Sequence, residues 1–183
     1  MSSFTVVSGV TRTLATVLKT ATGVDVDADR SPADAISDST SLIHLYLYRV
    51  EHNPFFTNLE PARPTPTQVR EPSLGLNLFY LITPYGSGQL QVQLTLGEIM
   101  HVFHDAPVID PVHFHPDVQD TTEELRVIPA PLSLQELTEL WRAFDGRSYR
   151  LSLSYEVSVA LIDSERSRVV VPVEERRVRV APW

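Results

Sequence analysis

Residues 131–146 hold the pattern that most restricts how this chain can fold. Ser133 and Glu136 form the Ser-x-x-Glu sequence of a capping box, in which each side chain hydrogen bonds to the backbone N–H of the other residue. Apolar side chains then recur at the spacing of one helical face, at Leu137, Leu140, Trp141 and Phe144. Gly146 follows, at a place where helices commonly end. The sequence therefore predicts a capped helix with one apolar face turned to a core.

A period of two replaces the helical period directly after this glycine, between Tyr149 and Ile162. Because successive side chains of a strand point to opposite faces, this alternation predicts a long strand. One face is apolar and holds Leu151, Leu153, Tyr155, Val157, Val159 and Leu161. The other face is polar and holds Ser152, Ser154, Glu156 and Ser158, which indicates that the strand lies partly at a surface.

Two more helices are predicted upstream. Helical spacing relates the apolar residues Val6, Val7, Val10, Leu14, Val17 and Leu18. Ser2 or Ser3 is placed to cap the start of this helix, and Gly23 lies near its end. Apolar residues between positions 90 and 104 form a second, weaker helical face that must end before Pro107. Residues 105–120 contain three prolines and no periodicity, so they are predicted to form a loop.

Three further strands complete the predicted fold. Residues 43–47 are bulky on both faces, which predicts a strand inside a sheet, and residues 74–82 give a second buried strand. A short strand is predicted at 125–128. A chain of 183 residues with 43% hydrophobic content can bury a core of its own. We therefore predict one domain, residues 1–183, of the mixed α/β (α+β) class, with a largely antiparallel sheet and about three helices packed on it.

Two segments are expected to stand apart from this core. Residues 54–72 contain five prolines, a density that predicts an irregular loop or arm, and the pair Phe55 and Phe56 opens it. An exposed aromatic pair on such an arm is a candidate docking element. Residues 168–181 are rich in valine and are interrupted by Pro172, which cannot donate to a sheet ladder. This second segment is therefore predicted to be an edge strand.

Composition excludes several classes of function. The 15 basic and 23 acidic residues give a formal charge of −8, which opposes general attraction to nucleic acid or to anionic membranes. The chain contains no cysteine, so disulfides, thiolate metal sites and cysteine nucleophiles are ruled out. The first residues do not resemble a signal peptide, and no run of about 18 apolar residues occurs. We expect a cytoplasmic protein whose partners are proteins or small molecules.

One histidine cluster has the spacing of a metal site. His101 and His104 could share a helix face, and His113 and His115 could share a strand face, which is enough for zinc or non-haem iron. The simpler interpretation is that the first pair lies at a helix C-terminus and the second pair is solvated. No nucleophile elbow, phosphate loop or dinucleotide fingerprint occurs. The prediction is a non-enzymatic protein without metal or cofactor, and a small metal-dependent enzyme is kept as an alternative.

Four sequence blocks in order resemble one family. They are LFYLITPYG (78–86), GEIMHVFHDAPV (97–108), PLSLQELTELW (131–141) and YRLSLSYEVSVAL (149–161). The chain resembles the cap, or tail-terminator, proteins of extracellular contractile injection systems, which are free phage-tail-like particles. The resemblance implies a terminator-like fold and a structural role at the distal end of the inner tube and the last sheath ring. It also implies a six-fold ring that ends assembly and holds the sheath extended, within a particle that can leave the cell.

The two segments that stand apart suit such contacts, because a ring uses different patches on each side of a subunit. Our hypothesis is that the C-terminal edge pairs with a sheath subunit by strand addition. The residues concerned are Val171, Val173, Val178, Arg176, Arg177 and Arg179, with the arginines facing acidic groups of the partner. The alternative is an intramolecular edge strand whose charged rim discourages aggregation. A cytoplasmic scaffold unrelated to any particle is a further alternative.

Overall fold

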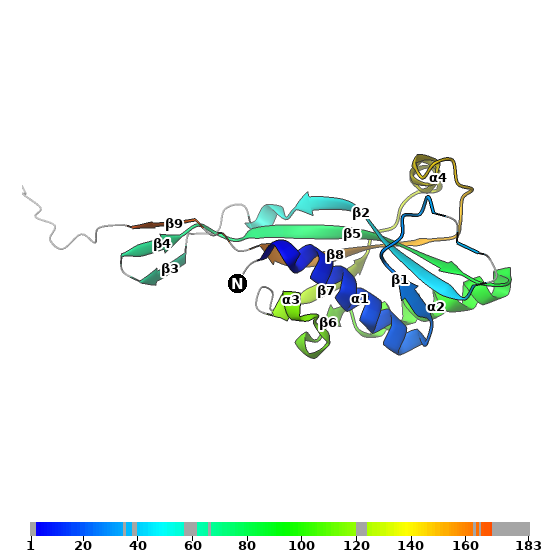
Figure 1. Cartoon of the computed structure of the whole chain (residues 1–183), viewed down its shortest axis with the longest axis horizontal. Helices are drawn as coiled ribbons and strands as arrows, with labels where there is room; N and C mark the ends of the chain where they lie inside the picture. The colour runs from blue at the N-terminus through cyan, green and yellow to red at the C-terminus, as the bar shows by residue number, and fades with distance from the viewer. Residues whose placement is uncertain are drawn as a thin grey trace, which may run out of the picture.

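The computed structural model describes residues 3–34, 36–37, 40–56, 62–65, 67–119, 124–162, 164 and 166–169. Its main sheet has six strands in the order β1-β2-β5-β8-β7-β6 (Figure 1). These are β1 (Asp25–Asp27), β2 (Leu42–His52), β5 (Leu74–Tyr85), β8 (Leu153–Ile162), β7 (Leu125–Pro129) and β6 (Val108–Ile109). Strand β1 runs parallel to β2, and the other neighbouring pairs are antiparallel. The predicted mixed α/β class and largely antiparallel sheet are confirmed.

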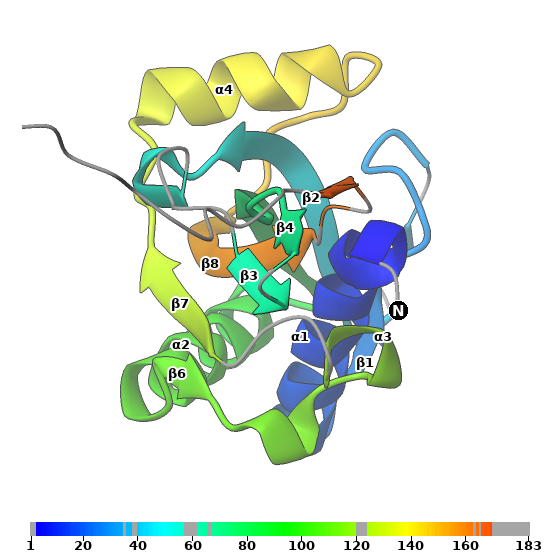
Figure 2. The same ribbon diagram turned by 90° about the vertical axis from the view of Figure 1, so that its left-hand side faces the viewer.

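Helices cover the sheet on both sides, as Figure 2 shows. Helices α1 (Val6–Thr22), α2 (Gln89–Asp105) and the short α3 (Pro116–Gln119) lie on one side. Helix α4 (Leu134–Ala143) lies alone on the other side. The larger core forms between the sheet and α1 to α3, and its fully buried members include Val10, Leu14, Leu18, Ile43, Leu78, Tyr80, Ile82 and Ile99. The three predicted helices are all present.

Helix α1 ends as predicted but begins differently. Gly23 is its C-cap, with φ of 69°, and the glycine N–H donates to the carbonyl of Lys19. At the other end, a 3₁₀ turn (Ser3–Thr5, η1) leads into the helix, and Thr5 is the N-cap without a side-chain cap hydrogen bond. The predicted cap by Ser3 is therefore wrong, and Ser2 lies outside the described residues. A capping side chain needs an extended backbone at the cap, whereas Thr5 is already helical.

The segment 105–120 is more regular than predicted. It contains β6, a 3₁₀ turn (Pro111–His113, η3) and α3. The Asp110 carboxylate accepts a hydrogen bond from the Val112 N–H at 2.9 Å and so starts η3. Helix α3 then packs closely on α1, because a Cβ at Gly9 would lie 2.7 Å from Cγ2 of Val118. The loop prediction is wrong here because these short elements depend on the Asp110 cap and on the contact with Gly9. Neither feature produces a periodic pattern in the sequence.

The face of strand β8 that carries the serines is buried, whereas the sequence predicts that it lies at a surface. It begins at Leu153 rather than Tyr149, and Ser152 and Ser154 are each only 8% exposed. The Ser154 hydroxyl bonds that of Tyr48 at 2.9 Å, and the Ser152 hydroxyl bonds that of Thr83 at 2.9 Å. The predicted surface position of these two serines is therefore wrong. Because each hydroxyl finds a partner, their burial is tolerated.

A β-bulge also interrupts the alternation of β8. Leu78 of β5 pairs with Val157, but Leu76 pairs with Ala160, so β8 holds one extra residue between these pairs. Val157 and Ala160 consequently both belong to the larger core, although they are three positions apart. The prediction that apolar residues share one face as far as Leu161 is wrong beyond Val157.

A second, small sheet projects from the body at one end of the molecule (Figure 1). Its strands are β3 (Ala62–Thr65), β4 (Gln68–Arg70) and β9 (Ser167–Val169), in the order β3-β4-β9. We call this sheet the arm. The prediction that residues 54–72 are irregular is wrong for β3 and β4. Pro64 is accommodated because β3 is an edge strand whose pairing is irregular between Ala62 and Thr65.

His44 of β2 is fully buried. Its Nε2 lies 3.0 Å from the carbonyl oxygen of Arg30, while its Nδ1 has no hydrogen-bond partner among the described residues. Burial is the largest influence on this ring and lowers the pKa of His44 from its ordinary value of 6.5, against the opposing effects of the Arg30 carbonyl and of Asp27. The folded protein therefore resists binding a proton that the unfolded chain accepts.

We expect the free energy of unfolding to fall as the pH drops below 6.5 towards the lowered pKa of His44. The loss is about 1.4 kcal/mol for each unit by which the folded pKa is lowered, and it is absent above pH 6.5 because both states are then neutral. Urea unfolding at several pH values measures this slope. His44→Gln should reduce it, whereas His52→Gln, at an exposed position, should leave it unchanged. Equal slopes in both variants would assign the effect to other groups.

Candidate functional site

The turn that connects β2 to the arm is held in place by one buried side chain. This turn is the 3₁₀ segment η2 (Pro54–Phe56). Asn53, which is only 7% exposed, accepts a hydrogen bond from the Phe55 N–H at 3.0 Å and donates to the side chain of Asn77 at 2.8 Å. Its own N–H donates to the carbonyl of Gly75 at 2.8 Å. Two of these hydrogen bonds fix the turn to strand β5, and the third holds the turn itself.

The two phenylalanines of this turn have different environments. Phe56 packs directly on Gly75. A Cβ added to Gly75 would lie only 2.7 Å from the Cβ and Cγ atoms of Phe56. Phe55 is 85% exposed. The predicted exposed aromatic pair is therefore one anchored ring and one displayed ring, and their role in an interface stays a prediction. A rigid turn that displays a large aromatic side chain loses little entropy on binding.

The arm carries the other candidate residues. Strand β9 forms one edge of the arm sheet, so part of the predicted edge strand 168–181 is present. Arg70, Arg166 and Arg168 are exposed there, and Arg168 lies 4.0 Å from Glu71. Val171, Val173, Arg176, Arg177, Val178 and Arg179 lie outside the described residues. The strand-addition hypothesis consequently stays a prediction that rests on the sequence.

The four histidines do not form a common centre. His101 pairs with Asp105 at 3.0 Å on α2, and His115 lies 3.2 Å from Asp117 beside α3. His104 and His113 are exposed. Within the ranges that the structure describes, no three His, Asp or Glu side chains are placed to hold one metal ion. The alternative of a metal-dependent enzyme therefore gains no support from this arrangement.

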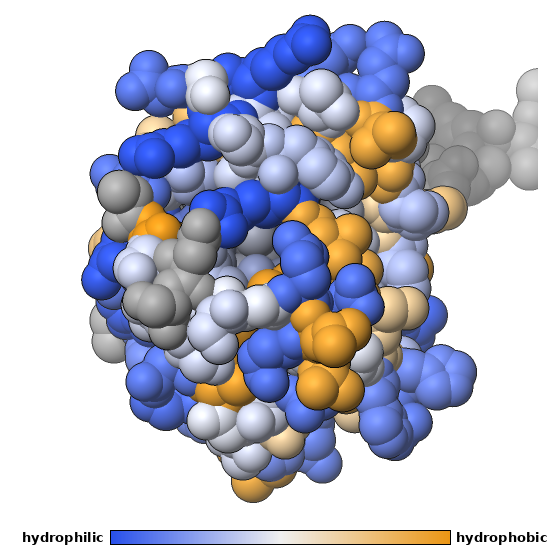
Figure 3. Space-filling view, turned by 90° about the vertical axis from the view of Figure 1, so that its right-hand side faces the viewer, coloured by the Kyte–Doolittle hydropathy of each residue, from blue (hydrophilic) through white to orange (hydrophobic). Residues whose placement is uncertain are grey.

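Sequence reasoning misplaced part of one apolar face. Leu94 and Met100 belong to the apolar helical face predicted between positions 90 and 104, but they are exposed, and so is Leu90. Figure 3 shows apolar side chains among polar ones at the end of the molecule where α2 begins. The signal was ambiguous because Thr95, rather than a leucine, occupies a buried position of this helix.

None of the helices in the described part of the chain is long and apolar enough to cross a membrane.

Comparison with known proteins identifies the family. The model of the Pvc16 N-terminal domain matches residues 6–176. The chain belongs to the Pvc16 N-terminal domain family. The match takes in the four described α-helices, the main sheet and the arm, and reaches Arg176 of the C-terminal segment. No curated protein matches the sequence.

Two solved structures share the fold of this Pvc16 N-terminal domain. One is the PVC sheath/tube terminator of an extracellular contractile injection system in the extended state, with a TM-score of 0.66 and 17% identity over 96% of the present chain. The other is the anti-feeding prophage cap, a tube-terminating cap, with a TM-score of 0.63 and 18% identity over 98% of the chain. The matches span 64% and 62% of those two proteins, so both relatives are longer than the region compared. The predicted terminator-like fold is confirmed.

Proposed function

We propose that this protein is a structural cap of a contractile injection system, without enzymatic activity. It binds the distal end of the inner tube and the last sheath ring, ends their assembly and holds the sheath in its extended state. Support comes from the family match over residues 6–176 together with a fold shared with a sheath/tube terminator and a tube-terminating cap. The described surface agrees with a binding role, because it displays Phe55 and an arm with unpaired edge strands.

Six copies form a ring in this proposal, assembled in the cytoplasm and then carried in the particle. A cyclic ring needs two different patches on each subunit, one for each neighbour. The arm projects from one end of the body (Figure 1), and the exposed leucines of α2 lie at the opposite end. A subunit with distinct binding elements at its two ends has the asymmetry that such a ring requires.

Deleting the gene in its natural host tests the proposal. Particles from the deletion strain are expected to lack extended sheaths or to show a broad distribution of tube lengths, because nothing ends growth at the distal end. Electron microscopy of purified particles measures both quantities, and the gene supplied in trans should restore them. Unchanged sheaths and tube lengths in the deletion strain would remove the cap function.

The finer proposal is that the C-terminal edge of the arm adds a strand to a sheath subunit. Strand β9 supports it, because it forms an edge of the arm and its chain continues into the valine-rich segment. Replacing Val178 with proline removes one backbone donor and should abolish particle binding while the isolated fold is retained. Cosedimentation with particles that lack the cap measures this binding. Val178→Thr, which keeps the N–H, is the matched control, and binding of the proline variant would refute strand addition.

A further inference from the structure

An open groove with a volume of about 640 Å³ lies between the C-terminal half of α2 and strands β7 and β8. Its floor is apolar and consists of Phe103, Val127 and Tyr155, which are 3%, 1% and 5% exposed. The rings of Phe103 and Tyr155 lie 4.9 Å apart, centre to centre. Neither the family match nor the proposed cap function gives this groove an occupant.

The hydroxyl of Tyr155 lacks a partner inside the fold. It forms no hydrogen bond with any described residue, and burial raises the pKa of Tyr155, so the group stays protonated. Two side-chain atoms of the described residues are both unpartnered and sealed from solvent, namely His44 Nδ1 and Trp141 Nε1. The Tyr155 hydroxyl is not one of them, so a ligand in the groove can reach it. A hydroxyl of this kind, on a buried side chain, marks a position for a polar ligand atom.

The other polar groups of the groove are chiefly acceptors. Val127 donates its N–H to the Pro107 carbonyl at 2.7 Å, but Pro107 has no N–H to return to the Val127 carbonyl. The Asp105 carboxylate lies at the rim, 3.0 Å from Nδ1 of His101. No lysine or arginine is among the described residues that line the groove. An apolar floor beside several acceptors suits an arginine side chain, which combines an apolar stem with several N–H donors and no acceptor.

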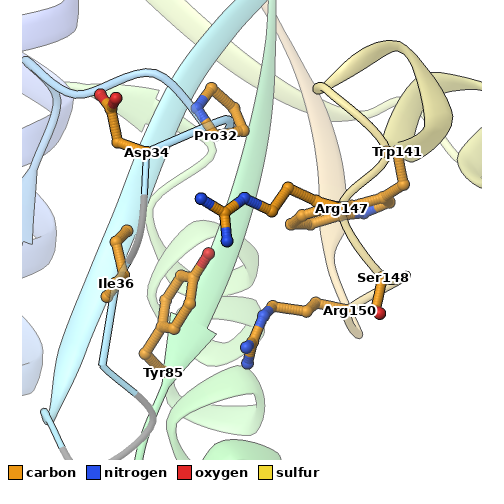
Figure 4. Close-up of a pocket in the computed structure, with 9 residues that line it drawn as sticks. Pro32, Asp34, Ile36, Tyr85, Trp141, Arg147, Ser148 and Arg150 are labelled. Carbon is orange, nitrogen blue, oxygen red and sulfur yellow. The ribbon is translucent and has the colours of Figure 1, made fainter.

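A polar pocket beside α4 is less suited to such a group. It lies between the C-terminal end of α4 and the loop after β1, and Arg147 and Arg150 line it (Figure 4). An arginine that entered this pocket would meet two guanidinium groups of like charge. The groove beside α2 is therefore the better receptor for an arginine.

The arm displays arginines that could enter this groove. Arg70, Arg166 and Arg168 are exposed, and Glu71 is the only acidic residue within the described parts of 62–73 and 164–169. The whole chain, in contrast, has a formal charge of −8. Arg70 belongs to β4, the central strand of the arm, and its side chain leaves the face opposite to that of the buried Val69. It makes no ion pair with a described residue.

We propose that the groove receives the arm of a second copy, with the apolar stem of Arg70 of that copy lying against the groove floor. Its guanidinium donates to the Tyr155 hydroxyl, the Val127 carbonyl and the Asp105 carboxylate. The arm projects away from α2 (Figure 1), so another copy must supply it. Such a contact joins two different surfaces of the chain, as a cyclic ring requires, and it leaves the edge strand β9 for a sheath subunit. The proposal names the partner of the arm within the proposed ring and rests on that part of the proposed function.

The methyl group of Met100 reports on the groove, because Met100 lines it and Met1 is the only other methionine of the chain. Protein labelled with ¹³C at the methionine methyl groups is titrated with unlabelled protein, and Met100→Leu identifies the resonance. We expect a saturable shift of the Met100 resonance. Added sodium chloride should weaken the binding, because the Asp105 side chain is 62% exposed and its charge is screened by salt.

Two variants that each lack one half of the contact make the test directional. Labelled Arg70→Gln keeps the groove and unlabelled Tyr155→Phe keeps the arm, so their mixture should still shift the Met100 resonance. Labelled and unlabelled Arg70→Gln together should bind at least about tenfold more weakly, as loss of charge-assisted hydrogen bonds predicts. Arg168→Gln is the matched control, because Arg168 pairs with Val69 and so lies on the other face of the arm. Backbone amide spectra show whether each variant keeps the fold.

Three results would overturn the inference. They are an unchanged Met100 resonance in the unaltered protein, equal binding by Arg70→Gln that remains folded, and a ring that forms without a shift of Met100. The last result would leave the cap function intact. Because the titration uses the purified protein alone, particles that are unchanged by deletion of the gene would refute the cap function without altering this measurement.

Discussion

Replacing Trp141 with alanine is expected to lower the free energy of unfolding by about 3–5 kcal/mol, the usual cost of removing a buried tryptophan. The side chain is 2% exposed and forms, with Leu81 and Phe144, the buried cluster described between α4 and the sheet. Its ring meets Phe144 edge to face at 5.7 Å, and Phe144 meets Tyr46 in the same way at 5.3 Å. Because so few residues anchor α4, the lost contacts cannot be replaced by neighbours.

Denaturant unfolding of the purified protein measures this loss. Leu134→Ala is the matched control, because Leu134 lies on the same helix and is largely exposed; its effect should stay within about 0.5 kcal/mol. The loss of unfolding free energy for Trp141→Phe should fall between the losses for these two variants, since phenylalanine keeps an aromatic contact and leaves a smaller cavity than alanine does. An alanine variant as stable as Leu134→Ala would mean that α4 is not held by this cluster.

The same helix shows what sequence patterns can establish. Its capping box is present as predicted, with the Ser133 N–H donating to the Glu136 carboxylate at 2.8 Å and the Ser133 hydroxyl accepting from the Glu136 N–H at 3.2 Å. Such bonds join residues three positions apart, so the sequence alone specifies them. The long strands were predictable for a similar reason, because hydrophobic alternation is a local property.

Features that depend on contacts distant in sequence could not be predicted. The burial of Ser152 and Ser154 requires Thr83 and Tyr48, which lie on other strands. The bulge in β8 is set by its pairing with β5, and no sequence feature near Val157 indicates it. The arm strands were missed because prolines usually oppose regular structure, whereas pairing between β4 and β9, nearly a hundred positions apart, overrides that tendency.

The candidate site was only partly visible in the sequence. The position of Phe55 and Phe56 in a proline-rich segment indicated an exposed pair, but the sequence could not divide them into an anchor and a displayed ring. That division depends on Gly75, which lies some twenty positions away and has room for Phe56 only because it lacks a Cβ.

Replacing Phe55 with alanine is expected to weaken retention of the protein on particles at least about tenfold, because a displayed aromatic ring on a fixed turn has the properties of a binding hot spot. The free energy of unfolding should change by less than about 0.5 kcal/mol, since the ring is 85% exposed. Cosedimentation with particles that lack the cap measures retention, and denaturant unfolding measures stability. This prediction rests on the proposed cap function.

Gly75→Ala separates a contact role of this turn from a structural one. The added methyl group would lie 2.7 Å from Phe56, so that ring must move, at a cost of about 1–3 kcal/mol in unfolding free energy. Movement of Phe56 displaces the turn, and retention on particles should fall although Phe55 is still present. Gly97→Ala is the matched control, because a Cβ there meets nothing within 4 Å, and it should leave retention unchanged. If Phe55→Ala is retained normally while Gly75→Ala loses only stability, the turn serves the fold and does not contact the particle.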